Sequence, residues 1–172
     1  MTRVMRIAGI QKDSITNGTG LRDVIFMQGC PHRCEGCQNP QTWNPEGGTE
    51  MTLDEIINEL KDSSNNVTIS GGEPFRDYRE LIELVCKITE TFPTKTIWIY
   101  TGYRINELAR WVLAILSMRG VEAIVDGQYV ERLRDTNLRF RGSSNQLIID
   151  LQRSYTEDKL ILWEDSNSES LR

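Results

Sequence analysis

Short apolar segments alternate with amphipathic segments along most of this chain. The apolar segments have the length of strands and are rich in Val, Ile and aromatic residues; they cover residues 24–27, 67–70, 96–100, 121–125 and 146–151. Between them, residues 52–62, 78–92 and 105–118 keep apolar side chains at helical spacing. Thr52 and Glu55 form a capping-box pattern at the first of these helices. The alternation predicts successive βα units around a parallel sheet.

The number of strands restricts the fold. Five strands, or six with residues 4–7, are too few for a complete eight-stranded barrel. We predict a single α/β domain that forms an incomplete, laterally open barrel of mostly parallel strands; a flat doubly wound sheet is the alternative. In both folds, ligands bind beyond the carboxyl ends of the strands. We expect residues 1–163 to form the core domain and the polar residues 164–172 to form a mobile tail.

The composition then excludes several classes of protein. The chain has 172 residues, of which 38% are hydrophobic and 26% are charged, as in one ordinary globular domain. Its net charge of −5 argues against nucleic acid or an anionic membrane as a partner. No apolar run reaches the about 18 residues that span a membrane, and the N-terminus lacks the apolar stretch of a secretory signal. We therefore expect a cytoplasmic protein.

Three of the four cysteines lie within one short loop. Cys30, Cys34 and Cys37 have the spacing C-x3-C-x2-C and directly follow the segment 24–27. Thiols in a reducing cytosol bind metal or do redox chemistry more often than they form disulfides. Three thiolates can hold three corners of a cubane iron–sulfur cluster and leave one iron open. The fourth cysteine, Cys86, occupies an apolar helical position and is interpreted as a buried core thiol.

Two other interpretations of the cysteine loop stay open. A zinc site could combine the three cysteines with His32, although the short spacing from Cys30 makes joint chelation awkward. A C-x-x-C redox pair of Cys34 and Cys37 is the second alternative. The loop by itself favours iron–sulfur chemistry only modestly.

A glycine turn follows the next strand. Gly71 and Gly72 permit positive φ and close approach to a ligand, and Glu73 and Pro74 follow them. Such a turn presents carbonyl oxygens, which suit an ammonium group. An ordinary βα turn is the alternative for this segment alone. The turn gains weight because it is predicted to share one rim of the sheet with the cysteine loop.

These two motifs together resemble the radical S-adenosylmethionine (SAM) enzymes, which combine C-x3-C-x2-C with GGEP. Residues 18–22 (GTGLR) and 38–43 (QNPQTW) are similar to the activators of glycyl-radical enzymes. Residues 141–146 (RGSSNQ) and the short length point to the activators of anaerobic ribonucleoside-triphosphate reductases. The resemblance covers about residues 7–149.

The resemblance implies a set of cofactor contacts. Cys30, Cys34 and Cys37 would ligate a [4Fe-4S] cluster whose open iron chelates the amino and carboxylate groups of SAM. Backbone oxygens of the glycine turn would hold the methionyl ammonium. Gly36 replaces the aromatic residue that many radical SAM loops carry near the adenine, so the adenine surface stays unassigned. The implied cofactor-binding residues are Gly36, Asn39, Gly71, Gly72, Glu73 and Asp126.

The resemblance also implies a reaction and its partners. The reduced cluster would give one electron to SAM, which would break into methionine and a 5′-deoxyadenosyl radical. That radical would take a hydrogen atom from a glycine Cα in the large subunit of the reductase, and a flavodoxin-like protein would supply the electron. No acid–base residue is needed, so His32, the single histidine, is interpreted as structural or solvated. A group of arginines is either a docking patch or a solvated basic face: Arg132, Arg134, Arg139 and Arg141.

Two further hypotheses differ from this one. The chain could activate another glycyl-radical enzyme or act on a small molecule by radical SAM chemistry. It could instead be a non-catalytic zinc-binding interaction module, which would leave GGEP and RGSSNQ unexplained.

Overall fold

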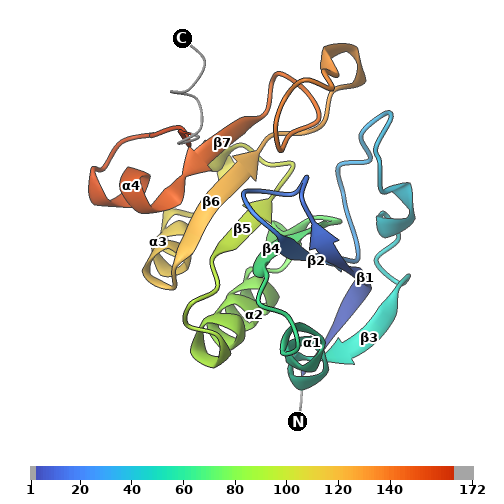
Figure 1. Ribbon diagram of the computed structural model, residues 1–172. Helices are drawn as coiled ribbons and strands as arrows, with labels where there is room; N and C mark the ends of the chain where they lie inside the picture. Colours follow the sequence, from blue (N-terminus) through green and yellow to red (C-terminus); the bar gives the residue numbers. More distant parts are fainter. Residues whose placement is uncertain (1–2, 165–172) are drawn as a thin grey trace.

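A computed structural model describes residues 3–164 and contains one seven-stranded sheet (Figure 1). The strand order is β3-β1-β2-β4-β5-β6-β7. Except for Glu164, the predicted tail 164–172 lies outside the described residues. The strands are β1 (Val4–Ser14), β2 (Arg22–Met27), β3 (Thr49–Thr52), β4 (Asn66–Gly71), β5 (Ile97–Tyr100), β6 (Val121–Asp126) and β7 (Leu147–Asp150).

The centre of the sheet is parallel and its edges are antiparallel. Strands β2, β4, β5 and β6 run parallel, as predicted. Strand β1 runs antiparallel to β2 and β3, and β3 was not predicted. The segment 146–151 does contain a strand, β7, but the expectation that it continues the parallel series is wrong. A parallel connection needs a crossover helix, whereas the segment between β6 and β7 contains only the 3-10 turn Glu131–Leu133.

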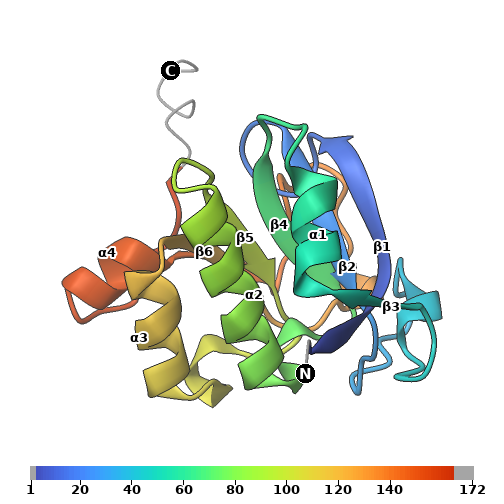
Figure 2. The same ribbon diagram turned by 90° about the horizontal axis from the view of Figure 1, so that it is seen from below.

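The α-helices within residues 3–164 all cover one face of the sheet. They are α1 (Leu53–Leu60), α2 (Tyr78–Thr91), α3 (Arg110–Met118) and α4 (Leu151–Thr156). Figure 2 shows α1, α2 and α3 side by side on this face, and each helix contacts the next. A doubly wound sheet carries helices on both faces, so that alternative is excluded. None of these described helices is long and apolar enough to cross a membrane.

The helix starts follow local hydrogen bonds. The predicted capping box at α1 is confirmed, because Thr52 and Glu55 bond reciprocally. Helix α3 begins at Arg110, five residues after the predicted start at residue 105. The Glu107 carboxylate accepts from the Arg104 backbone N–H at 2.6 Å, which closes a separate 3-10 turn before the helix.

The two faces of the sheet bury different side chains. On the helix face, Ile97 and Ile99 join a large aliphatic core. On the opposite face, Trp98 packs edge-on against Phe140 and Trp163, with ring centroids 5.5 and 5.2 Å apart. Alternation along β5 produces this division, since neighbouring side chains point to opposite faces. The helix-free face is therefore available for loops that build a site.

Arg22 fills part of this second face. Its guanidinium donates to the Thr68 hydroxyl and the Val67 carbonyl, both at 2.8 Å, and lies over the Trp98 ring. Burial lowers the pKa of Arg22 to about 10. A Cβ on Gly18 would lie 2.8 Å from the Arg22 side chain. The GTGLR motif (residues 18–22) therefore packs against the helix-free face of the sheet.

Candidate functional site

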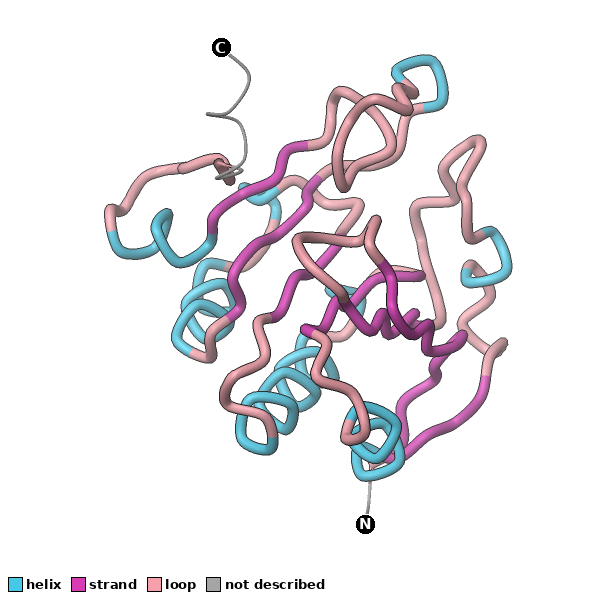
Figure 3. The backbone as a smooth tube through the Cα atoms, in the orientation of Figure 1, coloured by secondary structure: helices cyan, strands magenta, loops and turns pink. Residues whose placement is uncertain are grey.

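Two adjoining cavities form one cleft on the helix-free face, where the long loops after β2 and β6 lie (Figure 3). The smaller has a volume of about 180 Å³ and the larger about 470 Å³. The cavities share five lining residues: Asn17, Gln38, Asn39, Tyr100 and Gly142. The smaller one is lined by Cys30, Cys34, Cys37, Gly71 and Gly72. The structure thus brings the two sequence motifs together.

The cysteine loop leaves β2 with its three thiols free and partly exposed. Backbone bonds fix both of its ends: Gly29 N–H donates to the Thr42 carbonyl at 2.7 Å, and Cys37 N–H to the Cys34 carbonyl at 3.2 Å. Burial raises the pKa of the Cys30 and Cys34 thiols, and the neighbouring Cys37 raises that of Cys34 further. A bound metal centre opposes this effect, because coordination deprotonates a thiol.

The donor set fits an iron–sulfur cluster. Three thiols from one loop enter a single cavity, and thiolates are the ligands that such clusters use. Among the described residues, no three His, Cys, Asp or Glu side chains gather around one ion position. A zinc site needs its ligands to converge on one ion, with each sulfur about 2.3 Å away. A cubane differs, since each cysteine binds a different iron.

The two glycines of the turn serve different purposes. Gly71 has φ +93°, a conformation that favours glycine. Gly72 does not have positive φ; instead, a Cβ at this position would overlap the carbonyl of Gly29 in the cysteine loop. The backbone N–H of Glu73 donates to that same carbonyl at 2.8 Å. The turn is therefore packed directly onto the residue before Cys30.

The side chain of Glu73 is buried and fully engaged. One oxygen accepts from Phe75 N–H at 2.9 Å and the Thr101 hydroxyl at 2.8 Å. The other accepts from Gly102 N–H at 2.8 Å and His32 Nε2 at 2.7 Å. The carboxylate thereby joins the cysteine loop, the turn after β4 and the turn after β5. It contributes to the site as a structural bridge, while the predicted backbone contact to SAM stays a prediction.

The other predicted cofactor contacts occupy different positions. Asn39 lines both cavities. Gly36 has φ +73° and a Cβ there would overlap the Glu131 carboxylate; it lines neither cavity. Asp126 is 1% exposed, and its carboxylate accepts from Ile105 N–H at 2.8 Å. It also lines neither cavity, and its carboxylate contacts the backbone of Ile105 and Leu147 and the Arg104 guanidinium; its contact to the cofactor stays a prediction.

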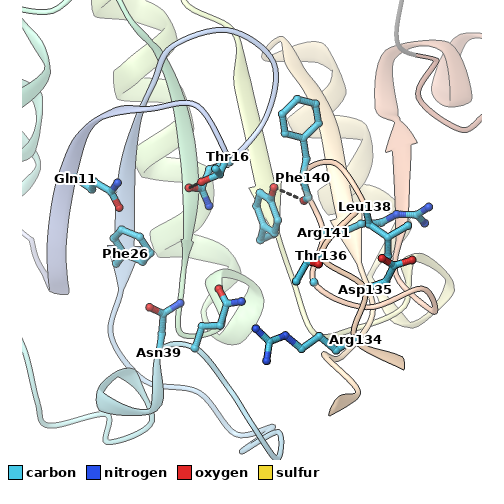
Figure 4. Close-up of a pocket in the computed structure, with 14 residues that line it drawn as sticks. Gln11, Thr16, Phe26, Asn39, Arg134, Asp135, Thr136, Leu138, Phe140 and Arg141 are labelled. Carbon is cyan, nitrogen blue, oxygen red and sulfur yellow. Dashed lines mark hydrogen bonds between the residues drawn. The ribbon is translucent and has the colours of Figure 1, made fainter. Parts of the chain in front are cut away.

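The larger cavity is lined by polar and aromatic side chains (Figure 4). Phe26 and Tyr100 come from the central strands, and Gln11 comes from β1. The Tyr100 hydroxyl donates to the Phe140 carbonyl, which ties the loop after β6 to the sheet. Burial raises the pKa of Tyr100, so this hydroxyl stays protonated at neutral pH.

The RGSSNQ segment holds the loop 127–146 in place. The Gln146 side-chain carbonyl accepts from Gly142 N–H at 3.0 Å and Ser143 N–H at 3.1 Å. Its amide nitrogen donates to the Gly127 carbonyl at 3.0 Å. Arg141 also donates to the Gln146 backbone carbonyl. The motif therefore shapes the second side of the cleft.

Comparisons with known proteins identify the family of this chain. The chain is 37% identical over 142 residues to the anaerobic ribonucleoside-triphosphate reductase-activating protein of Escherichia coli (strain K12), across 78% of this chain and 91% of that protein. The chain belongs to the family of anaerobic ribonucleoside-triphosphate reductase-activating proteins. The relative with this name in Enterobacteria phage T4 is 37% identical over 136 residues, across 76% of this chain and 84% of that protein. The Haemophilus influenzae relative is 34% identical over 142 residues, across 78% and 90%.

Two further comparisons concern a family model and a solved structure. Residues 16–149 match the family described as a 4Fe-4S single cluster domain, which includes the whole cleft except Gln11. A solved structure of QueE from Escherichia coli is similar at 20% identity and a TM-score of 0.45, over 58% of this chain and 52% of that one.

Some contacts of this site were predicted only in part. Of the two interpretations of His32, structural or solvated, the structure agrees with the structural one, because the side chain is only 8% exposed. The bonds of the Glu73 side chain to His32 and to the turn after β5 were not predicted. Both turns follow the ends of parallel strands, and this position could have indicated that they meet. Cys86 is half-buried on α2 and lies outside both cavities. The prediction of a fully buried thiol is wrong, because the core positions of α2 are Leu81, Leu84, Val85 and Ile88.

Proposed function

We propose that this chain is a radical SAM oxidoreductase that activates an anaerobic ribonucleoside-triphosphate reductase. In this proposal Cys30, Cys34 and Cys37 hold a [4Fe-4S] cluster, and SAM binds at the iron that no cysteine ligates. One observation carries the proposal: the three thiols and the glycine turn line one cavity, which opens into a second, larger one. Family membership, with relatives named for reductase activation, supports the choice of reaction.

In this proposal the chain's own residues bind and orient the cluster and SAM. A cluster held by the three cysteines would, once reduced, supply the electron for cleavage of SAM, and the radical so formed would take a hydrogen atom from a glycine Cα. The turn at Gly71 and Gly72 approaches the cysteine loop closely and offers carbonyl oxygens to the methionyl ammonium. Asn39 lines both cavities, and this position supports its proposed contact to SAM. No acid or base is required in the cleft.

The larger cavity is the proposed entry for the substrate glycine. Its amide side chains, which include Gln11, Asn17 and Gln38, suit the hydrogen-bonding groups of a polypeptide backbone. We infer that a loop of the reductase large subunit enters here. An incomplete, laterally open barrel would allow such entry. The one-sided helices and a sheet that ends at β3 and β7 without closing are compatible with that shape.

Reduction of the cluster requires an electron-donor protein. We propose a small flavodoxin-like protein that approaches the outer side of the cysteine loop. Arg33 and Glu35 are exposed there, next to the proposed cluster ligands. A donor at this side leaves the larger cavity free for the reductase.

The test uses electron paramagnetic resonance (EPR) on the complete system. The anaerobically reconstituted protein, reduced and mixed with SAM and its cognate reductase, should give a doublet from the one hydrogen left on the glycine Cα. Reductase labelled with deuterated glycine should collapse the doublet. SAM cleavage without any reductase radical would keep the radical SAM chemistry and overturn the named substrate. A colourless protein that binds one zinc tightly would overturn the whole proposal.

A further inference from the structure

His32 occupies a site built by three loops besides its own. Its Nε2 lies 2.7 Å from Glu73, and its Nδ1 lies 3.2 Å from the Gln128 side-chain amide. The ring packs edge-on against Tyr103, with centroids 4.6 Å apart. A Cβ on Gly102 would overlap the His32 ring, so only glycine at this position of the turn after β5 leaves room for the ring. An ordinary surface histidine needs none of these contacts.

The bonds to both nitrogens define one ring arrangement. The Glu73 carboxylate can only accept, so Nε2 carries the hydrogen in this bond. Nδ1 is then the acceptor for the amide of Gln128. The side chain of Glu73 is fully buried, and that of His32 is 8% exposed. A hydrogen bond in such an environment fixes the position of both partners, because breaking it leaves a buried polar group unpaired.

This bond connects the two cofactor motifs. His32 lies between Cys30 and Cys34, and Glu73 directly follows the two glycines of the turn. Backbone bonds also join these parts of the chain, but they lie before the first cysteine: Glu73 N–H donates to the Gly29 carbonyl and Gly72 N–H to the Met27 carbonyl, both at 2.8 Å. The His32 bond therefore holds the middle of the cysteine loop, which the backbone bonds do not reach.

We infer that His32 is a positioning residue that sets the cysteine loop, and thus the cluster, at a fixed place relative to the SAM-binding turn. The inference rests on the proposed function. It assigns no metal-binding or proton-transfer role to the ring. Iron binding and SAM binding should therefore depend on His32 differently. Without His32 the three thiols should still bind iron, but the distance from the iron to the turn should no longer suit one SAM molecule.

The experiment compares His32→Ala, His32→Gln and Gly102→Ala with the parent protein after anaerobic reconstitution. Glutamine can place its amide nitrogen near the position of Nε2 and donate to Glu73, while Gly102→Ala displaces the ring without removing it. The measurements are iron and sulfide per chain, SAM affinity by equilibrium dialysis, and the EPR spectrum of the reduced cluster with and without SAM. In the metal-free proteins, amide hydrogen exchange over residues 29–37 reports the loop itself.

We expect His32→Ala and Gly102→Ala to keep the iron content, weaken SAM binding about tenfold or more, and lose most of the SAM-induced EPR change. Exchange over residues 29–37 should be faster, and His32→Gln should recover most of each property. SAM affinity within about twofold of the parent in His32→Ala would overturn the inference. So would loss of iron in both His32 variants. A parent protein with no SAM-induced change would instead refute the proposed function.

Discussion

The two sides of the cleft are held by different means. On the cysteine side, the buried Glu73 carboxylate accepts four hydrogen bonds from groups up to 41 residues away in sequence. On the other side, the Gln146 amide bonds mainly to Gly142 and Ser143 within its own loop. A buried network between distant segments fixes a geometry, whereas the Gln146 bonds shape their own loop, which separate contacts such as that of Tyr100 with the Phe140 carbonyl tie to the sheet.

This difference matches the chemistry proposed for each side. A cluster and SAM have a fixed size and need fixed contacts, which the cysteine side supplies. A protein partner needs a surface that is exposed and polar, and the loop 127–146 exposes Arg132, Arg134 and Arg139. The two sides should therefore respond differently to substitution: the first in cofactor binding, the second in reductase activation.

The largest effect should come from Cys34→Ser. A serine hydroxyl stays protonated and is a harder ligand than a thiolate, so one corner of the cluster loses its ligand. We expect iron and sulfide content to fall sharply after reconstitution and SAM cleavage to be abolished. Cys86→Ser is the matched control, because this half-buried thiol lies outside the cleft. An equal loss of iron in Cys86→Ser would show that the three-cysteine assignment is wrong.

The next effect should come from Gly72→Ala. The new Cβ would overlap the Gly29 carbonyl, so either the turn or the cysteine loop must shift. Overpacking of this kind costs about 1–3 kcal/mol in the free energy of unfolding, and SAM affinity should fall about tenfold. Equilibrium dialysis and thermal unfolding measure the two quantities.

Gly9→Ala provides the control for this substitution. Nothing lies within 4 Å of a Cβ at that position, and Gly9 does not have positive φ. Its unfolding and SAM binding should match those of the parent protein. If Gly72→Ala also binds SAM normally, the glycine turn does not form part of the SAM site.

Sequence reasoning predicted the cysteine side better than the other side. The strands, the capping box and the two motifs all depend on local patterns, and four parallel strands bring Cys30 and Gly71 to one edge. The partners of Glu73 and His32 could not be predicted, since those bonds join turns that only the folded sheet brings together. The antiparallel direction of β7 was missed because its alternation of side chains is the same in either direction.

Gln146→Ala tests the second side of the cleft. It removes the acceptor for two backbone N–H groups and the donor to Gly127, at a cost of about 1–3 kcal/mol in the free energy of unfolding. We expect normal iron content and SAM affinity within about twofold, but reductase activation reduced about tenfold. Gln152→Ala is the control, because the Gln152 side-chain amide likewise bonds the backbone, donating to the Ser117 and Val121 carbonyls, but lies on α4 outside both cavities. Equal loss of activation in both variants would mean that general destabilisation causes the effect.

The smallest effect should come from Arg134→Glu. Arg134 is exposed on the loop 127–146 and lines the larger cavity, in a chain whose net charge is −5. A reversed charge at the rim of an interface changes association more than chemistry, and salt screens it. We expect the reductase concentration for half-maximal activation to rise about threefold at low salt and to approach the parent value at high salt, with SAM cleavage unchanged. Arg110→Glu supplies the same charge change on α3, where the side chain is 93% exposed and outside both cavities. If both variants weaken activation equally, association with the reductase depends on the overall charge of the molecule and not on the loop 127–146.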